Sequence, residues 1–198
     1  RSLKDGELAK ESPRDSSRRR LRSSPNSKSQ VAAPSEIAAQ LPGISRINRR
    51  GQKQLIIGLD FGTAFTKVVV GEDRFKLAIP LIGSGNRFAD YLCPTTMWKS
   101  SRGTYSLDRI DGQRLSDLKM ALINGNYGEE TKRNASVYLA YIFQRVRSHV
   151  FAEKRSLYDG QYINWIVNVG LPTDSYHDEN MSDVYREIIN LAWKLSLE

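Results

Sequence analysis

The chain has 198 residues, of which 39% are hydrophobic and 26% are charged, and its formal net charge is +8. This length is enough for one domain with a hydrophobic core, or for a domain with a tail. Residues 1–54 hold 13 Lys or Arg against 5 Asp or Glu, whereas residues 55–198 hold 17 of each sign. The excess charge therefore lies in the first 54 residues, and the charge does not indicate that residues 55–198 form a nucleic-acid-binding domain.

Residues 1–54 are rich in Ser, Arg and Pro and show no sustained apolar period, which is typical of a disordered tail or linker. The basic cluster at residues 18–22 is suited to weak contacts with nucleic acid or an anionic membrane surface, although a solvated tail also explains it. Ser35 is a candidate cap for a short helix over residues 34–41.

The chain has one cysteine, Cys93, so it has no internal disulfide and no zinc site built on several thiolates. We expect Cys93 to be a small buried hydrophobe and the protein to be cytoplasmic. No stretch is apolar for long enough to span a membrane. His149 and His177 lack the spacing of a metal-binding pair.

The segment 55–71 has the pattern of two strands joined by a polar turn. Its aliphatic and β-branched runs predict strands over residues 55–59 and 67–70, each covered on both faces. The linker is too short for a helical crossover, so the two strands should form an antiparallel hairpin.

The turn chemistry suits a polyphosphate. Gly62 lets the backbone bend and bring its N–H close to a phosphate, while Thr63 and Thr66 add hydroxyls. Lys67 adds a positive charge, and Asp60 would repel phosphate unless a cation such as hydrated Mg²⁺ lies between them. Asp, Gly and Thr are also ordinary turn residues, so a purely structural hairpin stays open as an alternative.

Beyond the hairpin, the pattern predicts further strands and three helices, which indicates an α/β fold with a mixed sheet flanked by helices. The predicted strands are residues 75–79, 92–98, 104–107 and 163–171, and the predicted helices are residues 116–123, 131–153 and a last helix that ends near Leu195.

The two longer helices are predicted to be amphipathic. The first has a stripe of core residues, and the remaining positions should form a solvated face. The stripe is Tyr138, Ile142, Val146 and Val150, and the solvated face is Arg145, Arg147 and His149. The apolar face predicted for the last helix is Val184, Ile188, Leu191 and Leu195, and its candidate caps are Asp174, Ser175 and Asp178.

The run Asp60-Phe61-Gly62-Thr63, followed by Thr66-Lys67, resembles the first phosphate motif of the actin, DnaK-type chaperone and sugar-kinase ATPase superfamily. Three later segments, at residues 90–98, 117–125 and 163–176, resemble chaperone segments in the family order. The resemblance covers about residues 55–198. Lys67 is closer to actin and to the plasmid-segregation actins than to DnaK, which lacks a lysine there.

This resemblance implies a ribonuclease-H-like mixed sheet that opens with an antiparallel hairpin meander. It implies ATP or ADP and Mg²⁺ as cofactors, with Asp60 holding the metal through water. The implied phosphate-binding residues are Asp60, Gly62, Thr63, Ala64, Thr66 and Lys67. Lys119 matches the segment that carries the catalytic lysine, which would orient the attacking water and stabilise developing charge.

The resemblance makes residues 55–198 the first lobe of an ATPase domain, without the second lobe and the second phosphate loop. We therefore expect weak nucleotide binding and negligible turnover from these 198 residues alone. The complete protein would couple its nucleotide state to the binding of a protein client. The alternatives are a filament-forming plasmid-segregation-type actin, a sugar kinase, and a non-catalytic binding module with a basic recruiting tail.

Overall fold

The computed structural model describes residues 52–198 apart from residues 74, 159 and 173–178. The chain divides into two units, Arg1–Pro34 and Ser35–Glu198, and every described residue belongs to the second unit. The predicted tail and the predicted helix at residues 34–41 lie outside the described residues, except that residues 52–54 belong to the first strand. The candidate caps Asp174, Ser175 and Asp178 and the second histidine, His177, lie outside them as well.

The first two strands, β1 (Gln52–Phe61) and β2 (Phe65–Glu72), form the predicted antiparallel hairpin. Both strands are longer than predicted, because pairing continues until the chain reverses. Asp60 and Thr66 therefore lie within strands, and the turn itself consists only of residues 62–64. Strand alternation then fixes the face of the sheet on which each of these two side chains lies.

The main sheet is mixed, as predicted. Strand β3 (Phe75–Ala78) continues the antiparallel meander on β2, and β8 (Tyr162–Val169) pairs in parallel with β1. The strand order is β3-β2-β1-β8, and the short strand β4 (Cys93–Pro94) pairs with β2 close to the turn. The turn at residues 62–64 therefore lies at one end of the sheet, beside β4.

The strand predicted over residues 92–98 is divided in two. Its first part is β4, and its second part, β5 (Met97–Lys99), belongs to a small separate sheet in the order β6-β5-β7. The other members of this sheet are β6 (Tyr105–Ser106) and β7 (Gln113–Leu115). The division occurs because β4 pairs with β2 whereas β5 pairs with β6 and β7, so the chain changes sheets at Thr95.

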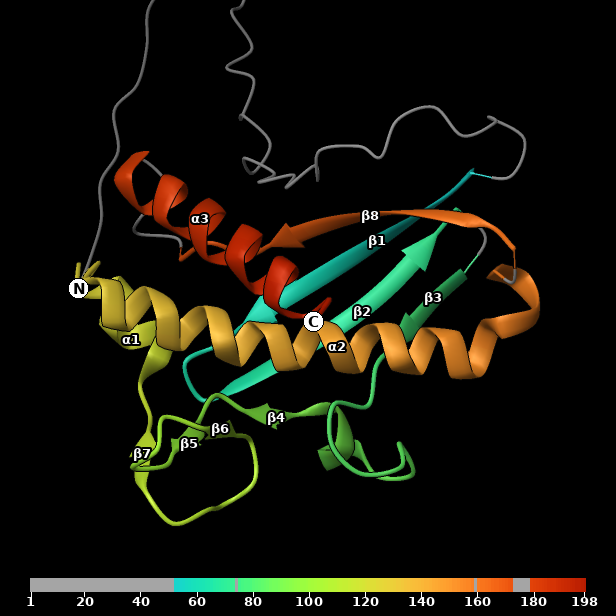
Figure 1. The fold of residues 1–198 in the computed structure, drawn as a ribbon. Helices are drawn as coiled ribbons and strands as arrows, with labels where there is room; N and C mark the ends of the chain where they lie inside the picture. The colour runs from blue at the N-terminus through green and yellow to red at the C-terminus, as the bar shows by residue number, and fades with distance from the viewer. Residues whose placement is uncertain (1–51, 74, 159, 173–178) are drawn as a thin grey trace, which may run out of the picture. The chain divides into compact units, whose positions relative to one another are not determined.

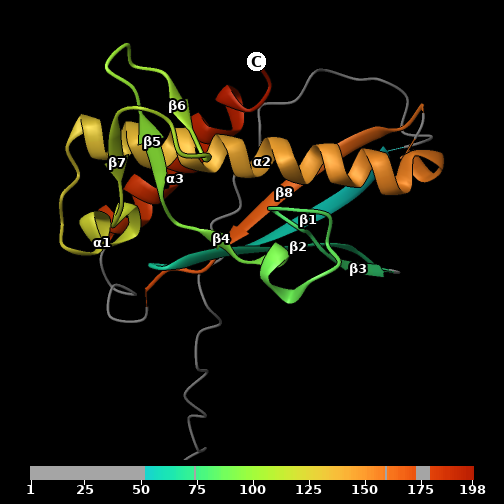
Figure 2. The same cartoon turned by 90° about the horizontal axis from the view of Figure 1, so that it is seen from below.

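The described residues form three α-helices, α1 (Leu118–Ile123), α2 (Glu129–Tyr158) and α3 (Glu179–Leu195). Helices α2 and α3 lie side by side on the same face of the main sheet (Figures 1 and 2). The described part of the chain is thus a mixed α/β fold. None of its helices is both long and apolar enough to cross a membrane.

The main sheet is covered on one face only by the described residues. Along β1, the side chains of Leu55 and Ile57 are fully buried, whereas Ile56 between them is 39% exposed. On β2, Val69 is 44% exposed. The prediction that these strands are covered on both faces is therefore wrong for the described residues, because α2 and α3 both pack on the same side of the sheet.

The predicted core stripe of α2 is confirmed, since all four of its residues are buried. The solvated face predicted beside it is wrong at Arg147, which donates a hydrogen bond to the Ser196 carbonyl and lies over the ring of Trp193. On α3, Leu191 is 40% exposed while Trp193 is buried. Ile188 is buried as predicted and Val184 packs against the core, so the buried face of α3 overlaps the predicted one but includes Trp193 instead of Leu191.

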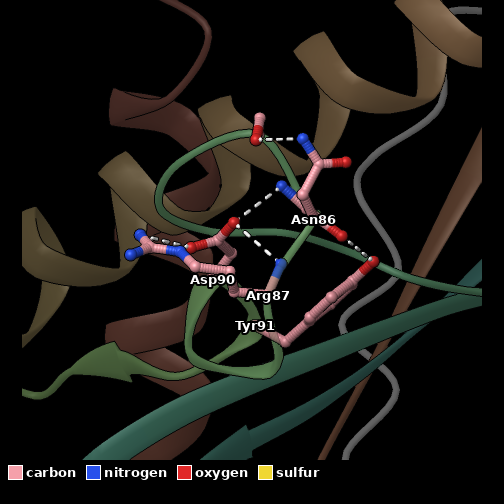
Figure 3. Close-up of polar contacts among 6 residues, drawn as sticks. Asn86, Arg87, Asp90 and Tyr91 are labelled. Carbon is pink, nitrogen blue, oxygen red and sulfur yellow. Dashed lines mark hydrogen bonds and ion pairs between the residues drawn. The ribbon is translucent and has the colours of Figure 1, made fainter.

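A polar loop after β3 is held by one buried carboxylate, Asp90, in a short 3₁₀ helix (Phe88–Tyr91) (Figure 3). Asp90 accepts hydrogen bonds from the backbone N–H groups of Gly85 and Arg87 and pairs with the Arg87 side chain. Burial alone would raise the pKa of Asp90, but these hydrogen bonds and the charge of Arg87 lower it below its ordinary value. The loop leads into Cys93, which is buried as predicted.

Candidate functional site

The turn between β1 and β2 requires glycine at its first position. A Cβ atom on Gly62 would overlap the backbone carbonyl oxygen of Phe65, so any other residue forces the turn to move. Thr63 and Ala64 follow and are exposed. The sequence therefore predicted correctly that glycine shapes this turn, and the two residues after it are open to solvent.

Hydroxyl groups on the covered face of the sheet stabilise the turn. Thr95, just after β4, donates its hydroxyl to the Gly62 carbonyl at 2.8 Å, and its backbone N–H donates to the Ala64 carbonyl at 2.9 Å. The hydroxyls of Thr66 and Thr95 lie 3.2 Å apart, and Thr66 is fully buried. The sequence placed Thr66 among the phosphate ligands, but its side chain lies on the covered face and contacts the support of the turn.

Helix α2 contributes to the same support. The hydroxyl of Tyr138 donates to the carbonyl of Pro94 at 3.1 Å, and its ring stacks against Phe61 at the end of β1. Burial raises the pKa of Tyr138, so the hydroxyl stays protonated and remains a donor. Tyr138 thus links α2 to β1 and to β4 next to the turn.

The opposite face of the hairpin carries charge. Asp60 and Lys67 are directly opposed in the strand register, and the Lys67 Nζ lies 2.7 Å from the Asp60 Oδ2. Their side chains are 58% and 51% exposed, respectively. An exposed pair of this kind contributes about 1 kcal/mol or less to stability, so the two side chains are free to exchange partners.

Lys119, the predicted catalytic residue, comes to the same place from a distant segment. It lies near the start of α1, which is beside the β1–β2 turn in both views (Figures 1 and 2). Partial burial lowers the pKa of Lys119, and the nearby negative charge of Asp60 acts in the opposite direction. The residue before this helix, Asp117, has a left-handed backbone (φ 58°), which is uncommon outside glycine and marks a constrained entry into α1.

Asp60 and Lys67 therefore form an ion pair beside the turn, and Lys119 is near enough to Asp60 for their charges to interact, which makes a group of one carboxylate and two amines. The cluster carries one net positive charge when all three groups are ionised, which suits an anion. The carboxylate oxygens of Asp60 are of the hard type that Mg²⁺ prefers, and their exposure leaves room for metal-bound water. No group of three or more His, Cys, Asp or Glu side chains that could hold a metal occurs among the described residues.

Two further residues belong to this region and were not predicted as site residues. Thr95 is one, and its place directly after Pro94 in the resembling segment was the available signal. Asn168 is the other: it pairs with Gly58 in the register, and its neighbours Val167 and Val169 are buried, so its side chain lies on the open face with Asp60. A polar residue within an apolar strand was the signal for Asn168.

The sequence matches no protein-family model, and no curated protein is similar to it at a significant level.

Proposed function

We propose that residues 52–198 form the first lobe of an actin- or DnaK-type ATPase and that the β1–β2 turn binds the polyphosphate of ATP with Mg²⁺. The observation that carries this proposal is the meeting of Asp60, Lys67 and Lys119 at a turn that requires glycine. A hairpin that is only structural needs neither an exposed charge cluster nor a distant, partly buried lysine near its carboxylate.

The sheet supports the same proposal. The resemblance implies a ribonuclease-H-like sheet that opens with an antiparallel meander, and the order β3-β2-β1-β8, with β8 parallel to β1, agrees with it. The helices α2 and α3 on one face agree with it as well. We therefore propose that the main sheet is of the ribonuclease-H-like type.

Each residue of the site has a role that follows from its position. The N–H groups of residues 62–64 would donate to phosphate oxygens, and Asp60 would accept hydrogen bonds from the water shell of Mg²⁺. Lys119 would stabilise charge on the terminal phosphate and orient a water molecule. Thr66 and Thr95 would keep the turn in shape without touching the ligand.

The resemblance assigns the adenosine pocket and the second phosphate loop to a second lobe. We therefore propose polyphosphate binding for the residues described, and ATP hydrolysis coupled to a client or filament partner for a two-lobe protein. ATP-dependent sedimentation of such a protein would indicate the filament-forming alternative. Nucleic-acid binding that disappears when residues 1–51 are deleted would indicate the recruiting-module alternative.

The direct test is a titration of the ¹⁵N-labelled 198-residue chain with Mg-tripolyphosphate, followed by amide NMR. We expect the amide signals of Gly62, Thr63 and Ala64 to shift with a common dissociation constant, and Lys119→Met to weaken this binding about tenfold. Lys76→Met is the matched control, because Lys76 is an exposed lysine on β3 whose register partner, Gly71, lies far from the turn along β2. A folded protein whose turn amides do not respond would contradict the proposal.

A further inference from the structure

Lys67 is placed to neutralise Asp60 without a metal ion. The two residues are register partners on adjacent strands, and the amine lies 2.7 Å from a carboxylate oxygen. The hairpin keeps the two residues adjacent, since the cross-strand position brings the two Cβ atoms close together whatever is bound. A lysine here is therefore a permanent neighbour of the carboxylate.

The electrostatic problem at this site has two solutions. A bare carboxylate beside the turn repels phosphate, and a hydrated divalent cation removes the repulsion by lying between them. A tethered amine removes the same repulsion, and it costs no ion binding because the strand already holds it in place. Lys119 adds a second amine within the electrostatic reach of Asp60.

We propose that Lys67 is a built-in cation of this site, which lets the turn bind a polyphosphate without a divalent ion and makes Mg²⁺ compete with Lys67 for Asp60. This inference rests on the proposed function, because it assumes that the turn binds polyphosphate. It concerns the specificity of the site: the preferred ligand class is a polyphosphate whether or not it carries a metal.

The exposure of the pair makes the exchange feasible. With 51% of Lys67 and 58% of Asp60 exposed, solvent screens the ion pair, and the amine can turn from the carboxylate to a phosphate oxygen without a large loss. Mg²⁺ gains less than usual from Asp60 while Lys67 is beside it, because the two cations repel each other. Removing the amine should therefore create a dependence on the metal.

The test compares tripolyphosphate binding in EDTA and in Mg²⁺ for the full chain, with the dissociation constant taken from the amide shifts of residues 62–64. For the wild type we expect constants that differ by less than about threefold between the two buffers. For Lys67→Met, which keeps the aliphatic stem but removes the amine, we expect binding in EDTA to weaken at least about tenfold, or 1.4 kcal/mol, and to recover in Mg²⁺.

Two further variants make the result specific. Lys67→Arg keeps the positive charge and should behave like the wild type. Lys76→Met removes an exposed lysine on β3, whose register partner is Gly71, far from the turn along β2, and should change neither constant. Amide spectra of each variant establish that it is folded.

The outcomes separate this inference from the proposed function. Wild-type binding that requires Mg²⁺ as strongly as Lys67→Met does would overturn the role of Lys67 and leave polyphosphate binding intact. No response of the turn in either buffer would overturn both. A Lys67→Met protein that binds equally well with and without Mg²⁺ would also overturn the inference.

Discussion

The two faces of the β1–β2 hairpin differ in the exposure and charge of their side chains, although both belong to the same two strands. On the covered face, Leu55, Ile57 and Val70 are fully buried beneath α2 and α3, whereas on the open face Asp60 and Lys67 are more than half exposed and paired. Strand alternation places these two sets at neighbouring positions. Substitutions on the covered face should therefore change stability, and substitutions on the open face should change binding.

The largest expected effect is on the covered face at Phe61. Its ring is fully buried and contacts the rings of Tyr138 and Tyr185, so Phe61→Ala should lower the free energy of unfolding by about 3–5 kcal/mol. Urea denaturation measures this change. Ile56→Ala, on the open face of the same strand, is the control and should cost about 1 kcal/mol or less, because Ile56 is already 39% exposed. Equal losses in the two variants would break the comparison between the faces.

Gly62→Ala should affect both properties, because the turn joins the two faces. The added Cβ would overlap the Phe65 carbonyl, so we expect a loss of about 1–3 kcal/mol in stability together with weaker polyphosphate binding. Gly170→Ala is the matched control, since no atom lies near the position of its Cβ. A Gly62→Ala protein with unchanged stability and binding would show that the turn is not constrained as described.

A smaller effect on stability is expected from Thr95→Val, which lies next to the turn on the covered face. This change removes the hydroxyl that donates to Gly62 and faces Thr66, at a cost of about 1 kcal/mol. Hydrogen exchange of the turn amides should become faster, whereas Thr104→Val, at an exposed position, should leave it unchanged. Turn amides that exchange at the wild-type rate in Thr95→Val would contradict the role of this hydroxyl.

The smallest effect on stability is expected from Asp60→Asn, because the ion pair with Lys67 is exposed. The informative measurement is instead the titration of Lys119 by NMR of its side chain. Burial lowers the pKa of Lys119 and Asp60 opposes this, so Asp60→Asn should lower that pKa further. An unchanged Lys119 pKa would mean that the two groups do not interact.

The same shift predicts a pH dependence. Because the folded-state pKa of Lys119 lies below its unfolded value, the charged amine opposes folding at neutral pH. This opposition disappears as the pH rises through the folded-state pKa, so the contribution of Lys119 to stability improves towards alkaline pH. Lys119→Met should remove that part of the pH dependence in urea denaturation series.

The sequence predicted those features of the hairpin that depend on local chemistry. A linker of few residues forced the antiparallel pairing, and Gly62 was predicted because a sharp reversal excludes a side chain. The buried positions of Tyr138 and Cys93 followed from helical period and residue type. Each of these features is determined by residues that are close together in the sequence.

The remaining features depend on partners that are distant in the chain. Thr66 was predicted to offer its hydroxyl to phosphate, but it is buried, and its burial depends on the strand register and on Thr95, which lies 29 positions away. The exposure of Leu191 depends on which face of α3 meets α2 and β8. Nothing in the local sequence brings Lys119 near Asp60, and only the family resemblance suggested that arrangement.

The central claim is that the open side of the β1–β2 turn is a polyphosphate site, and the amide map of a tripolyphosphate titration tests it most directly. The account predicts shifts concentrated at residues 62–64 and at Lys119, with weaker binding in the Lys119→Met variant. Shifts confined to the basic residues 1–51, with the turn unaffected, would contradict the account and show that the polyanion binds only through charge in the N-terminal segment.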